Sequence, residues 1–580
     1  MIIGIDLGTT NSVASYMSST RPVLIPNALG RFLTPSVVGI DDSGKVIVGN
    51  AAKEYQVVKP RNCASLFKRY MGSDRSIQVG GREFTAEQLS SLILKSLKQD
   101  AEAFFGTAVN EAVITVPAYF NDNQRKATIA AGQMAGFDVK RILNEPTAAA
   151  MAYGMHELSQ DRLLMVLDLG GGTFDVSVVE VFDGSLEVKA SSGESILGGE
   201  DFTVAMASHL LAERKQVFEK MELQNPLFIS RLIHQCEQAK QKLAFGERAT
   251  IRIPDENGEY SAQSESVEVD LSQFNAATQK ILERIELPIR RALGDADLTR
   301  GQIDQVLLIG GATRMACFQE YVERTFRRTP LAEINPDEAV AFGAAVQAGL
   351  IANNSAVADL VVTDVCPFTL GIEISRQLGN ETVDQYFLPI IDRNTTIPAS
   401  RVRRVGTVSH GQRSVDLNIY QGEGRKVTDN LLIGSFKAKG VPDGPAGQEI
   451  DVRFTYDLNG VLEVEATIVA TGHRVSHVLT RYAKELGPEQ LKAALLQLQS
   501  LKSHPRDELP SQNTLKRAER VYTELPPRLR DELGDFIASF EAALLSQDPK
   551  VVEAIRDELE SFLDNVEGDM RDGNGADESW

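Results

Sequence analysis

The sequence predicts a multidomain chain in which an α/β region precedes an antiparallel β region and then a helical region. Short apolar runs alternate with helical stretches over residues 1–355, polar and apolar residues alternate over 366–480, and apolar residues at helical spacing mark 487–564. A length of 580 residues fits three or four domains. Alternating strands and helices indicate an α/β domain in the first region.

In the α/β region, four apolar runs predict buried strands: residues 1–6, 112–116, 163–168 and 306–309. The second run is closed by Pro117. Residues 122–135 predict a helix that ends at Gly136.

The β region is predicted from strict alternation. Val415, Leu417 and Ile419 alternate with polar neighbours, and Asn459-Gly460 separates two further alternating runs. Asn-Gly between such runs is a strong short-range signal for a hairpin, so we expect an antiparallel β domain.

The helical region carries apolar stripes such as Leu491, Leu495 and Leu498, and the spacing returns at Ile555 and Leu559. We interpret these stripes as the core of a helical bundle. The Gly- and Asp-rich end, from residue 566, predicts a disordered tail.

The segment between the first two regions, residues 359–365, contains Leu360-Val361-Val362 and is apolar, whereas an ordinary linker is polar. Two interpretations stay open. The segment docks somewhere in at least one state, or it begins the first strand of the β region.

Composition excludes several classes of protein. The formal net charge of −20 argues against nucleic acid and anionic membrane as partners. With neither an apolar run of ~18 residues nor a leader signal in view, we expect no membrane association and a cytoplasmic location. The widely spaced cysteines predict free, buried thiols: Cys63, Cys236, Cys317 and Cys366.

The most informative feature is an internal echo. The run IDLGTT (5–10) recurs as LDLGGGT (167–173), each time after an apolar strand, and IGGATR (309–314) adds a third glycine turn. Such turns point backbone N–H groups at an anion, while an aspartate at a strand end can hold Mg²⁺ through its water shell. We therefore expect a phosphate site between two similar lobes. The turns match neither a Walker A loop nor GxGxxG, which disfavours a P-loop ATPase and a Rossmann dehydrogenase.

Phosphoryl transfer to water requires positioning more than a strong base. Lys68 and Glu145 are candidates for this role. Pattern alone leaves both ambiguous, since a lysine is usually a surface residue and a glutamate before proline usually lies in a turn.

With these motifs together, the chain resembles the seventy-kilodalton heat-shock chaperones of the DnaK type. The resemblance spans residues 1–480 and continues more loosely through the helical end. The matching segments are GIDLGTTNS (4–12), VPAYFND (116–122), NEPTAAAMAYG (144–154), DLGGGTFDVSVVE (168–180), LGGEDF (197–202), IGGATRM (309–315), INPDEAVAFGAAVQAG (334–349), PFTLGIE (367–373), NTTIP (394–398) and YQGE (420–423).

The resemblance implies an actin-like two-lobed ATPase domain, a linker, a β-sandwich that binds extended peptide, an α-helical lid covering that sandwich, and an acidic tail. The implied bounds are 1–358, 359–365, 366–482, 483–565 and 566–580. It also implies ATP or ADP, Mg²⁺ and K⁺ as cofactors, and ATP hydrolysis coupled to peptide binding and release.

Site residues carry over by motif. The implied catalytic residues are Lys68, Glu145, Asp168 and Thr173. The implied nucleotide-binding residues are Asp6, Gly8, Thr9, Thr10, Asn11, Gly170, Gly171, Gly172, Gly199, Glu200, Glu237, Lys240, Gly310, Gly311, Arg314 and Asp337. Asp6, Asp168 and Asp175 would hold Mg²⁺ through water or help to place K⁺.

Coupling and peptide binding carry over in the same way. The implied allosteric residues are Pro117, Arg141, Asn144, Leu360 and Asp364, of which Pro117 resembles a switch between the lobes. Arg141, Asn144 and Asp364 would meet a J-domain co-chaperone. The implied peptide cleft is lined by Ile372, Ile374, Val405, Val408, Val415 and Leu417.

Departures from the general pattern resemble a specialised bacterial, HscC-like branch. Residues 252–270 form a short hairpin-like stretch where general members carry a longer loop that engages an exchange factor, so dependence on such a factor is doubtful. Ser375 and Val408 alter the cleft arch. Clients are expected to be unfolded or extended peptides.

Two other functions share DxGxT-type turns. A sugar or glycerol kinase on the same fold would have no use for the β and helical regions, and phosphorylation assays on common sugars would reveal it. A filament-forming scaffold would sediment with ATP, and the linker and sandwich argue against it.

Overall fold

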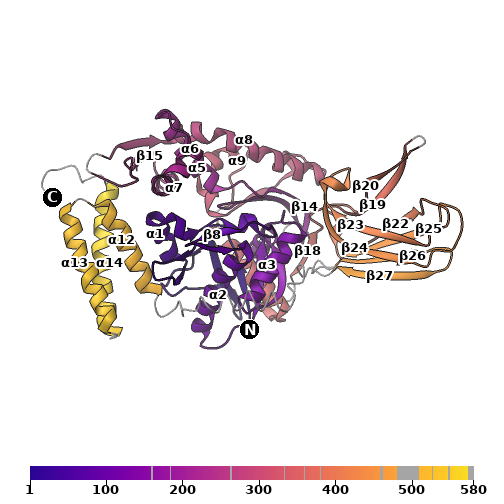
Figure 1. Cartoon of the computed structure of the whole chain (residues 1–580), viewed down its shortest axis with the longest axis horizontal. Helices are drawn as coiled ribbons and strands as arrows, with labels where there is room; N and C mark the ends of the chain where they lie inside the picture. The colour runs from indigo at the N-terminus through magenta and orange to yellow at the C-terminus, as the bar shows by residue number, and fades with distance from the viewer. Residues whose placement is uncertain are drawn as a thin grey trace.

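The computed structural model describes residues 1–157, 161–182, 185–261, 264–331, 334–357, 360–378, 381–456, 462–479, 509–525, 527–546 and 549–572. Figure 1 shows a two-lobed α/β domain in the middle, a β-sandwich at one end and a three-helix bundle at the other. The sandwich and the bundle therefore contact different ends of the same central domain.

The first lobe is built on a sheet with strand order β11-β10-β1-β2-β3, in which β1 pairs in parallel with β10 and antiparallel with β2. A buried apolar core fills the space between this sheet and its helices. Its elements are β1 (Ile2–Asp6), β2 (Asn11–Met17), β3 (Pro22–Ile25), β4 (Thr34–Pro35), β5 (Val38–Ile40), β6 (Val46–Val48), α1 (Asn50–Val58), η1 (Pro60–Asn62), β7 (Cys63–Ala64), η2 (Phe67–Tyr70), β8 (Ile77–Val79), β9 (Arg82–Phe84), α2 (Ala86–Phe105), β10 (Glu111–Val116), α3 (Asp122–Met134), β11 (Asp138–Asn144) and α4 (Glu145–Glu157).

The second lobe repeats this plan with strand order β17-β12-β13-β14, and β12 pairs in parallel with β17 and antiparallel with β13. The echo in the sequence therefore corresponds to two sheets of similar construction. Its elements are β12 (Arg162–Leu169), β13 (Phe174–Phe182), β14 (Ser185–Glu194), α5 (Gly199–Glu213), α6 (Phe218–Gln224), α7 (Pro226–Leu243), β15 (Arg248–Arg252), β16 (Ser266–Asp270), α8 (Leu271–Asp295), η3 (Arg300–Gln302), β17 (Gln305–Ile309), η4 (Gly311–Arg314) and α9 (Ala316–Phe326). The chain then returns to the first lobe through α10 (Ala339–Ile351), which packs against β1 and β2, and continues into η5 (Ser355–Val357).

The apolar linker forms a strand, β18 (Val361–Val365), at the edge of the second lobe. It pairs in parallel with β14 from Ser185 to Glu187, and its end pairs antiparallel with β21 (Thr396–Ile397) of the sandwich. Both interpretations of the segment hold in part, because it is a docked linker and also a strand. Parallel addition satisfies edge N–H and C=O groups that would otherwise face solvent.

The β-sandwich has two four-stranded antiparallel sheets, β20-β19-β23-β24 and β22-β25-β26-β27, around one apolar core. The predicted Asn459-Gly460 turn lies outside the described residues, but the strands on either side of it, β25 and β26, pair antiparallel. The elements are β19 (Leu370–Leu378), β20 (Glu381–Ile391), β22 (Ala399–Gly406), β23 (Ser414–Gln421), η6 (Val427–Asp429), β24 (Leu431–Lys439), β25 (Glu449–Tyr456), β26 (Leu462–Ile468) and β27 (His473–Leu479).

The helical bundle comprises α12 (Leu509–Glu524), α13 (Pro527–Ser546) and α14 (Pro549–Asp572) around its own core. We expected a lid over the sandwich, and this expectation does not describe the present conformation. The bundle packs on α1 of the first lobe, at the far end from the sandwich (Figure 1). The Leu491–Leu498 stripe and the remainder of 480–508 lie outside the described residues.

The boundary predicted for the disordered tail, residue 566, lies too early in the chain. Helix α14 continues to Asp572, and Glu567 is buried because it pairs with Arg517 and Arg520 of α12. Residues 573–580 lie outside the described part of the chain. The ion pairs make the first part of this acidic segment part of the bundle.

Candidate nucleotide site

The two predicted phosphate loops face each other across the lobes. Thr10 follows β1, and Gly171 follows β12. A Cβ atom added at Gly171 would lie 2.2 Å from the Thr10 side chain, so only glycine lets the two turns approach this closely. Gly310, with φ of 81°, is pressed against the Leu169 carbonyl and brings the third turn to the same place.

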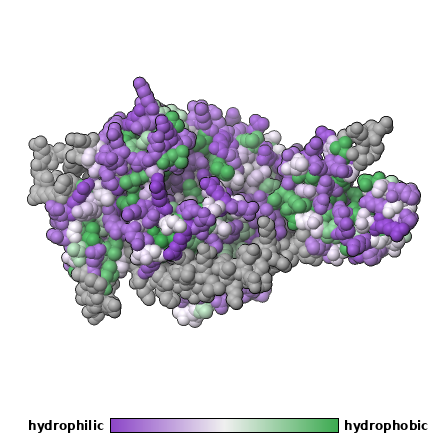
Figure 2. Space-filling model, viewed as in Figure 1, coloured by the Kyte–Doolittle hydropathy of each residue, from purple (hydrophilic) through white to green (hydrophobic). Residues whose placement is uncertain are grey.

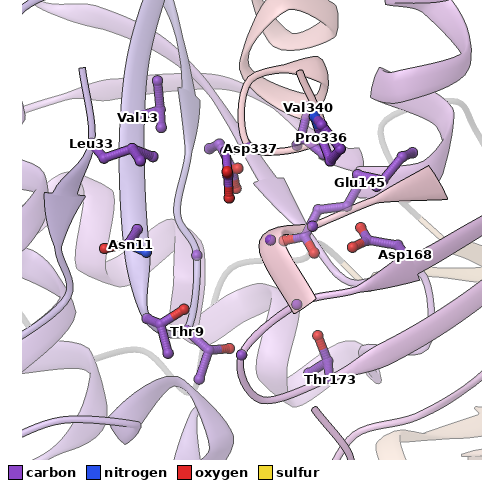
Figure 3. A pocket seen from close by; sticks show the side chains of 18 of the residues that line it. Thr9, Asn11, Val13, Leu33, Glu145, Asp168, Thr173, Pro336, Asp337 and Val340 are labelled. Carbon is purple, nitrogen blue, oxygen red and sulfur yellow. The ribbon is translucent and has the colours of Figure 1, made fainter. Parts of the chain in front are cut away.

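Together these turns border an open cleft between the lobes, with about 540 Å³ of empty space including the solvent at its opening. In Figure 3, Thr9 and Asn11 lie on the side of the first lobe, while Asp168 and Thr173 face them from the second. The lining residues are Asp6, Gly8, Thr9, Thr10, Asn11, Val13, Leu33, Lys68, Glu145, Asp168, Gly170, Gly171, Thr173, Ile309, Gly310, Gly311, Pro336, Asp337 and Val340.

Lys68 and Glu145, which sequence patterns left ambiguous, form a buried ion pair in this cleft. The Lys68 Nζ–Glu145 Oε1 distance is 2.7 Å, and the side chains are only 3% and 9% exposed. A lysine is rarely buried so completely without a specific partner. The pair fixes a cation at the wall of the cleft, which is where a positioning group would act.

Carboxylates crowd around this lysine. Burial raises the pKa of Asp6 and of Asp175 to about 7, and the negative charge of Glu145 adds to both shifts. The same two causes raise the pKa of Asp168 well above its usual range. A site with this excess of buried negative charge fits a divalent cation, which would stabilise all three ionised forms.

The carboxylates do not converge as direct metal ligands. In the described part of the chain, no three Asp, Glu, His or Cys side chains are close enough to one another to hold an ion directly. Separated carboxylates around an open cleft suit Mg²⁺ that retains its water shell, as Mg²⁺ prefers.

A second cluster lies on α5 and α7 at the edge of the cleft. Lys240 pairs with Glu237 at 2.6 Å and donates to the Gly199 carbonyl at 2.8 Å, and Thr203 donates to Glu237. Although burial opposes the shift, Lys240 and these hydrogen bonds lower the pKa of Glu237 to about 2. Glu237 is therefore ionised and held in one orientation, able to accept hydrogen bonds from a sugar hydroxyl.

The remaining predicted nucleotide residues surround the cleft without lining it. Gly199 and Glu200 donate their backbone N–H groups to the Gly170 and Gly171 carbonyls, which ties α5 to the phosphate loop. Gly172 accepts from Arg69 at 3.2 Å through its carbonyl. Arg314 pairs with Asp337 at 2.8 Å, across the third turn.

A chain of polar contacts leads from the loop after Pro117 to the linker. Arg125 is buried and donates to the Ala118 carbonyl at 3.0 Å and to Asn144 Oδ1 at 2.7 Å. Asn144 donates to Asp364 Oδ2 at 2.8 Å, and Thr147 donates to the same oxygen at 3.2 Å. Leu360, only 9% exposed, packs in the apolar core at the base of the two lobes.

The other allosteric candidates lie near this path. Pro117 is buried directly after β10, and Arg141 lies on β11 beside Val113 of β10. Asp175 accepts from the Tyr119 N–H at 3.1 Å, so a predicted metal residue also contacts the loop that follows Pro117.

The sandwich is held against this region by further contacts. The Tyr119 and Phe368 rings lie 4.7 Å apart, and the Asp122 N–H donates to Gln421. On the other side, Asp295 of α8 pairs with Arg393 at 2.6 Å and accepts from Asn394 at 2.9 Å.

The predicted peptide-cleft residues differ in exposure. Ile372 and Leu417 are 1% and 2% exposed and belong to the sandwich core. Ile374, Val405 and Val415 are half-buried against that core, and Val408 is 56% exposed in the loop between β22 and β23. On the face drawn in Figure 2, hydrophobic side chains gather over the sandwich, while hydrophilic ones dominate the two-lobed domain.

Sequence reasoning missed several residues that the fold brings to these sites. Val13, Leu33 and Val340 line the cleft but look like any core residue in the sequence. Arg125 could have been noticed, because it is a lone arginine on the Ala-rich helix 122–135. Arg69, which pairs with Asp201 of the second lobe at 2.5 Å, gave no signal beyond its place next to Lys68.

A family model described as Hsp70 protein matches residues 2–79 and 74–572. The match spans nearly the whole chain, and the chain therefore belongs to the Hsp70 family. Members of this family are ATP-dependent chaperones that bind ATP or ADP with Mg²⁺, act on client peptides and work with J-domain co-chaperones. Among the described helices, none is both long and apolar enough to cross a membrane.

Proposed function

We propose that this protein is a specialised, HscC-like chaperone of the Hsp70 family, in which nucleotide in the cleft controls the release of extended apolar peptides from the sandwich. Family membership supports the ATP-dependent chaperone activity. The proposal adds the residue roles, the coupling path and the specialised clientele.

The observation that carries the proposal is the docked linker. Strand β18 extends the sheet of the second lobe through β14 and pairs at its end with β21 of the sandwich. Asp364 on this strand accepts hydrogen bonds from Asn144 and Thr147. These two residues lie on either side of Glu145, which lines the cleft. One continuous set of contacts thus runs from the cleft to the sandwich.

In the cleft, the backbone N–H groups of the glycine turns and the hydroxyls of Thr9, Thr10 and Thr173 would bind phosphate oxygens. Asp6, Asp168 and Asp175 would hold Mg²⁺ through water and help to place K⁺. Magnesium, when bound, offsets charge on the phosphate oxygens during transfer. The adenosine would lie toward Glu237, Lys240 and Arg314.

Lys68 would orient the attacking water and the terminal phosphate, with Glu145 fixing its ammonium group and Thr173 assisting. A buried cation that is already held by a hydrogen bond to Glu145 costs little reorganisation during the reaction. Lys68 and Glu145 therefore act as positioning groups, and no strong general base is required.

Coupling would run through Pro117, Arg125 and Asn144 to the linker. Closure of the lobes around ATP would favour the docked strand, and hydrolysis would release it. Arg141, Asn144 and Asp364 would form the surface that a J-domain contacts. This qualifies as allostery, because two distinct sites bias the same two states.

Peptide would bind the sandwich as an extended strand, with backbone hydrogen bonds and an apolar pocket. Ile374, Val405, Val415 and Val408 present partly exposed apolar surface for this purpose, above Ile372 and Leu417 of the core. The bundle lies away from the sandwich, as expected for an open, fast-exchanging state. Ser375 and Val408 would set a client preference different from that of general chaperones.

The test is the release rate of a fluorescent apolar peptide with and without ATP, in the wild-type chain, Lys68→Ala and Pro117→Ala. We expect ATP to accelerate release in the wild type and in Lys68→Ala, while Lys68→Ala loses hydrolysis by roughly 100-fold or more. Pro117→Ala is expected to bind peptide normally but to respond weakly to ATP. Lys59→Ala, an exposed lysine near the end of α1, is the matched control.

Release that ignores ATP in the wild type would refute the coupling. A chain that hydrolyses ATP but binds no extended peptide would refute the client proposal and leave the nucleotide site standing.

A further inference from the structure

The two lobes also touch each other through a helix of each lobe, away from the glycine turns. Ser230 Oγ of α7, in the second lobe, donates to the Gln56 carbonyl of α1, in the first lobe, at 3.0 Å. Helices α1 and α7 pack against each other along this line, which we call the α1–α7 seam. Opening of this seam would separate the two lobes on the α1 and α7 side of the cleft.

Helix α12 of the bundle lies across the seam and contacts both lobes. Arg520 Nε pairs with Glu54 Oε2 of α1 at 2.5 Å, and Lys516 Nζ lies 4.1 Å from the Tyr55 ring centroid. At its other end, the Glu524 carbonyl accepts from Arg252 of β15, in the second lobe, at 3.0 Å. Figure 1 shows α12 beside α1, with β15 above its upper end.

These contacts are buried. Arg520 is 5% exposed and Glu524 is 7% exposed, and Glu567 of α14 completes the cluster by pairing with Arg520. The Arg520 guanidinium thus pairs at once with a carboxylate of the first lobe and with carboxylates on α12 and α14. Removal of a partner from such a buried network leaves charge unpaired, so the docked bundle resists being pulled away.

Helix α7 connects the proposed nucleotide site with the region beneath the bundle. On α7, Glu237 and Lys240 belong to the adenosine side of the cleft, while His234 lies beneath the bundle one turn earlier. Burial lowers the pKa of His234 to about 3, with the nearby positive charges of Arg520 and Lys53 adding to the shift. His234 accordingly stays neutral, and its ring contacts Gln238 at 3.0 Å.

We infer that the docked bundle is a built-in clamp on nucleotide release: α12 holds the α1–α7 seam closed from both sides. The bundle and the linker are docked in the same conformation, so the clamp acts in the state in which the sandwich lacks its lid. Undocking of the bundle would then free the lid helices and open the seam together. The inference requires the nucleotide site but not the chaperone cycle.

The test uses the full-length chain loaded with a slowly hydrolysed fluorescent ATP analogue and chased with unlabelled ATP. Glu54→Gln weakens the contact with the first lobe, and Arg252→Ala weakens the contact with the second. Each is expected to speed release about fivefold or more, because losing about 1 kcal/mol shifts an equilibrium by that factor. In the double variant, the release rate is expected to increase by less than the product of the two single-variant increases. Both substitutions act by detaching the same bundle, so the second adds little once the bundle is detached.

Matched controls separate clamping from local damage. The first control is Arg248→Ala, since Arg248 lies on the same strand as Arg252 and pairs with the exposed Glu268; the second is Lys59→Gln, directly after α1. Both are expected to release nucleotide at the wild-type rate. Hydrogen exchange of α12 amides should increase in Glu54→Gln and Arg252→Ala, while α13 keeps its protection.

Wild-type release rates in Glu54→Gln and Arg252→Ala, with α12 demonstrably exposed, would overturn the clamp. Equal acceleration by Arg248→Ala would also overturn it, because the hairpin alone would then explain the effect. A wild-type chain that binds no nucleotide would instead refute the site on which the inference rests.

Discussion

The central two-lobed domain is held at its two ends by different kinds of contact. At the sandwich end, β18 adds to a sheet edge, and polar side chains such as Asp364 and Arg393 join neutral or partly exposed partners. At the bundle end, Arg520 is buried among three carboxylates from α1, α12 and α14.

The difference shows how each end can switch. Strand addition and partly exposed polar contacts are worth about 1 kcal/mol each, so several weak contacts can form and break in steps. A buried charge network breaks as a unit, since losing one partner leaves the others desolvated and unpaired. The sandwich end is suited to graded coupling and the bundle end to an all-or-none release.

The largest expected effect comes from breaking the bundle end. Arg520→Ala leaves Glu54, Glu524 and Glu567 facing one another, and we expect the opening free energy of α12 to fall by about 3 kcal/mol. Hydrogen exchange of α12 amides measures it. Arg556→Ala is the control, because Arg556 pairs with the exposed Asp557 of the same helix. If the hydrogen-exchange protection of α12 fell less in Arg520→Ala than in Arg556→Ala, the buried ion pairs of Arg520 would not stabilise the docked bundle.

A smaller effect is expected at the linker. Asp364→Asn keeps the shape of the side chain but removes the negative charge that accepts hydrogen bonds from Asn144 and Thr147. The free energy of linker docking should become less favourable by about 1–2 kcal/mol. ATP-stimulated peptide release should fall about 5–30-fold, and exchange of β18 amides should increase. Asp429→Asn, an exposed aspartate on η6, should change neither readout. Unchanged coupling in Asp364→Asn would remove Asp364 from the path.

The Asp295 contact is expected to matter less. Arg393 and Asp295 are 29% and 18% exposed, so Arg393→Ala should weaken ATP stimulation by about 1 kcal/mol, or roughly fivefold. Asp295→Asn should cost more than Arg393→Ala, because Asn394 also donates to Asp295. Peptide-release kinetics in a double-mutant cycle test the order, and equal effects would show that Asn394 contributes nothing.

The smallest effect is expected away from both ends. Arg404 on β22 pairs with Asp451 and Glu449 at the exposed surface of the sandwich, where solvent screens the charges. Arg404→Ala should leave both peptide release and α12 protection unchanged. A change in either would mean that net charge, rather than the specific contacts compared above, controls the two ends.

Much of the lining of the cleft could be predicted from the sequence. The turns at residues 5–10, 167–173 and 309–314 depend on local backbone freedom and on an aspartate beside them, so the residues that we propose to bind phosphate are neighbours in the chain. Lys68 and Glu145 needed the resemblance, because neither residue type nor spacing distinguishes a buried pair from a surface lysine and a turn. Val13 and Leu33 gave no signal, since core and cleft require the same apolar side chains.

The sequence by itself determined the order of the three architectures, the repeated lobes and the apolar character of the linker, because periodicity and turn chemistry act over a few residues. Only the tertiary structure decided which surfaces meet. Glu54 and Arg520 are more than four hundred positions apart, and no local pattern distinguishes this buried pair from two exposed charges on separate helices. Burial against a specific partner depends on the packing of the whole chain, and so the position of the bundle across the α1–α7 seam emerged only from the fold.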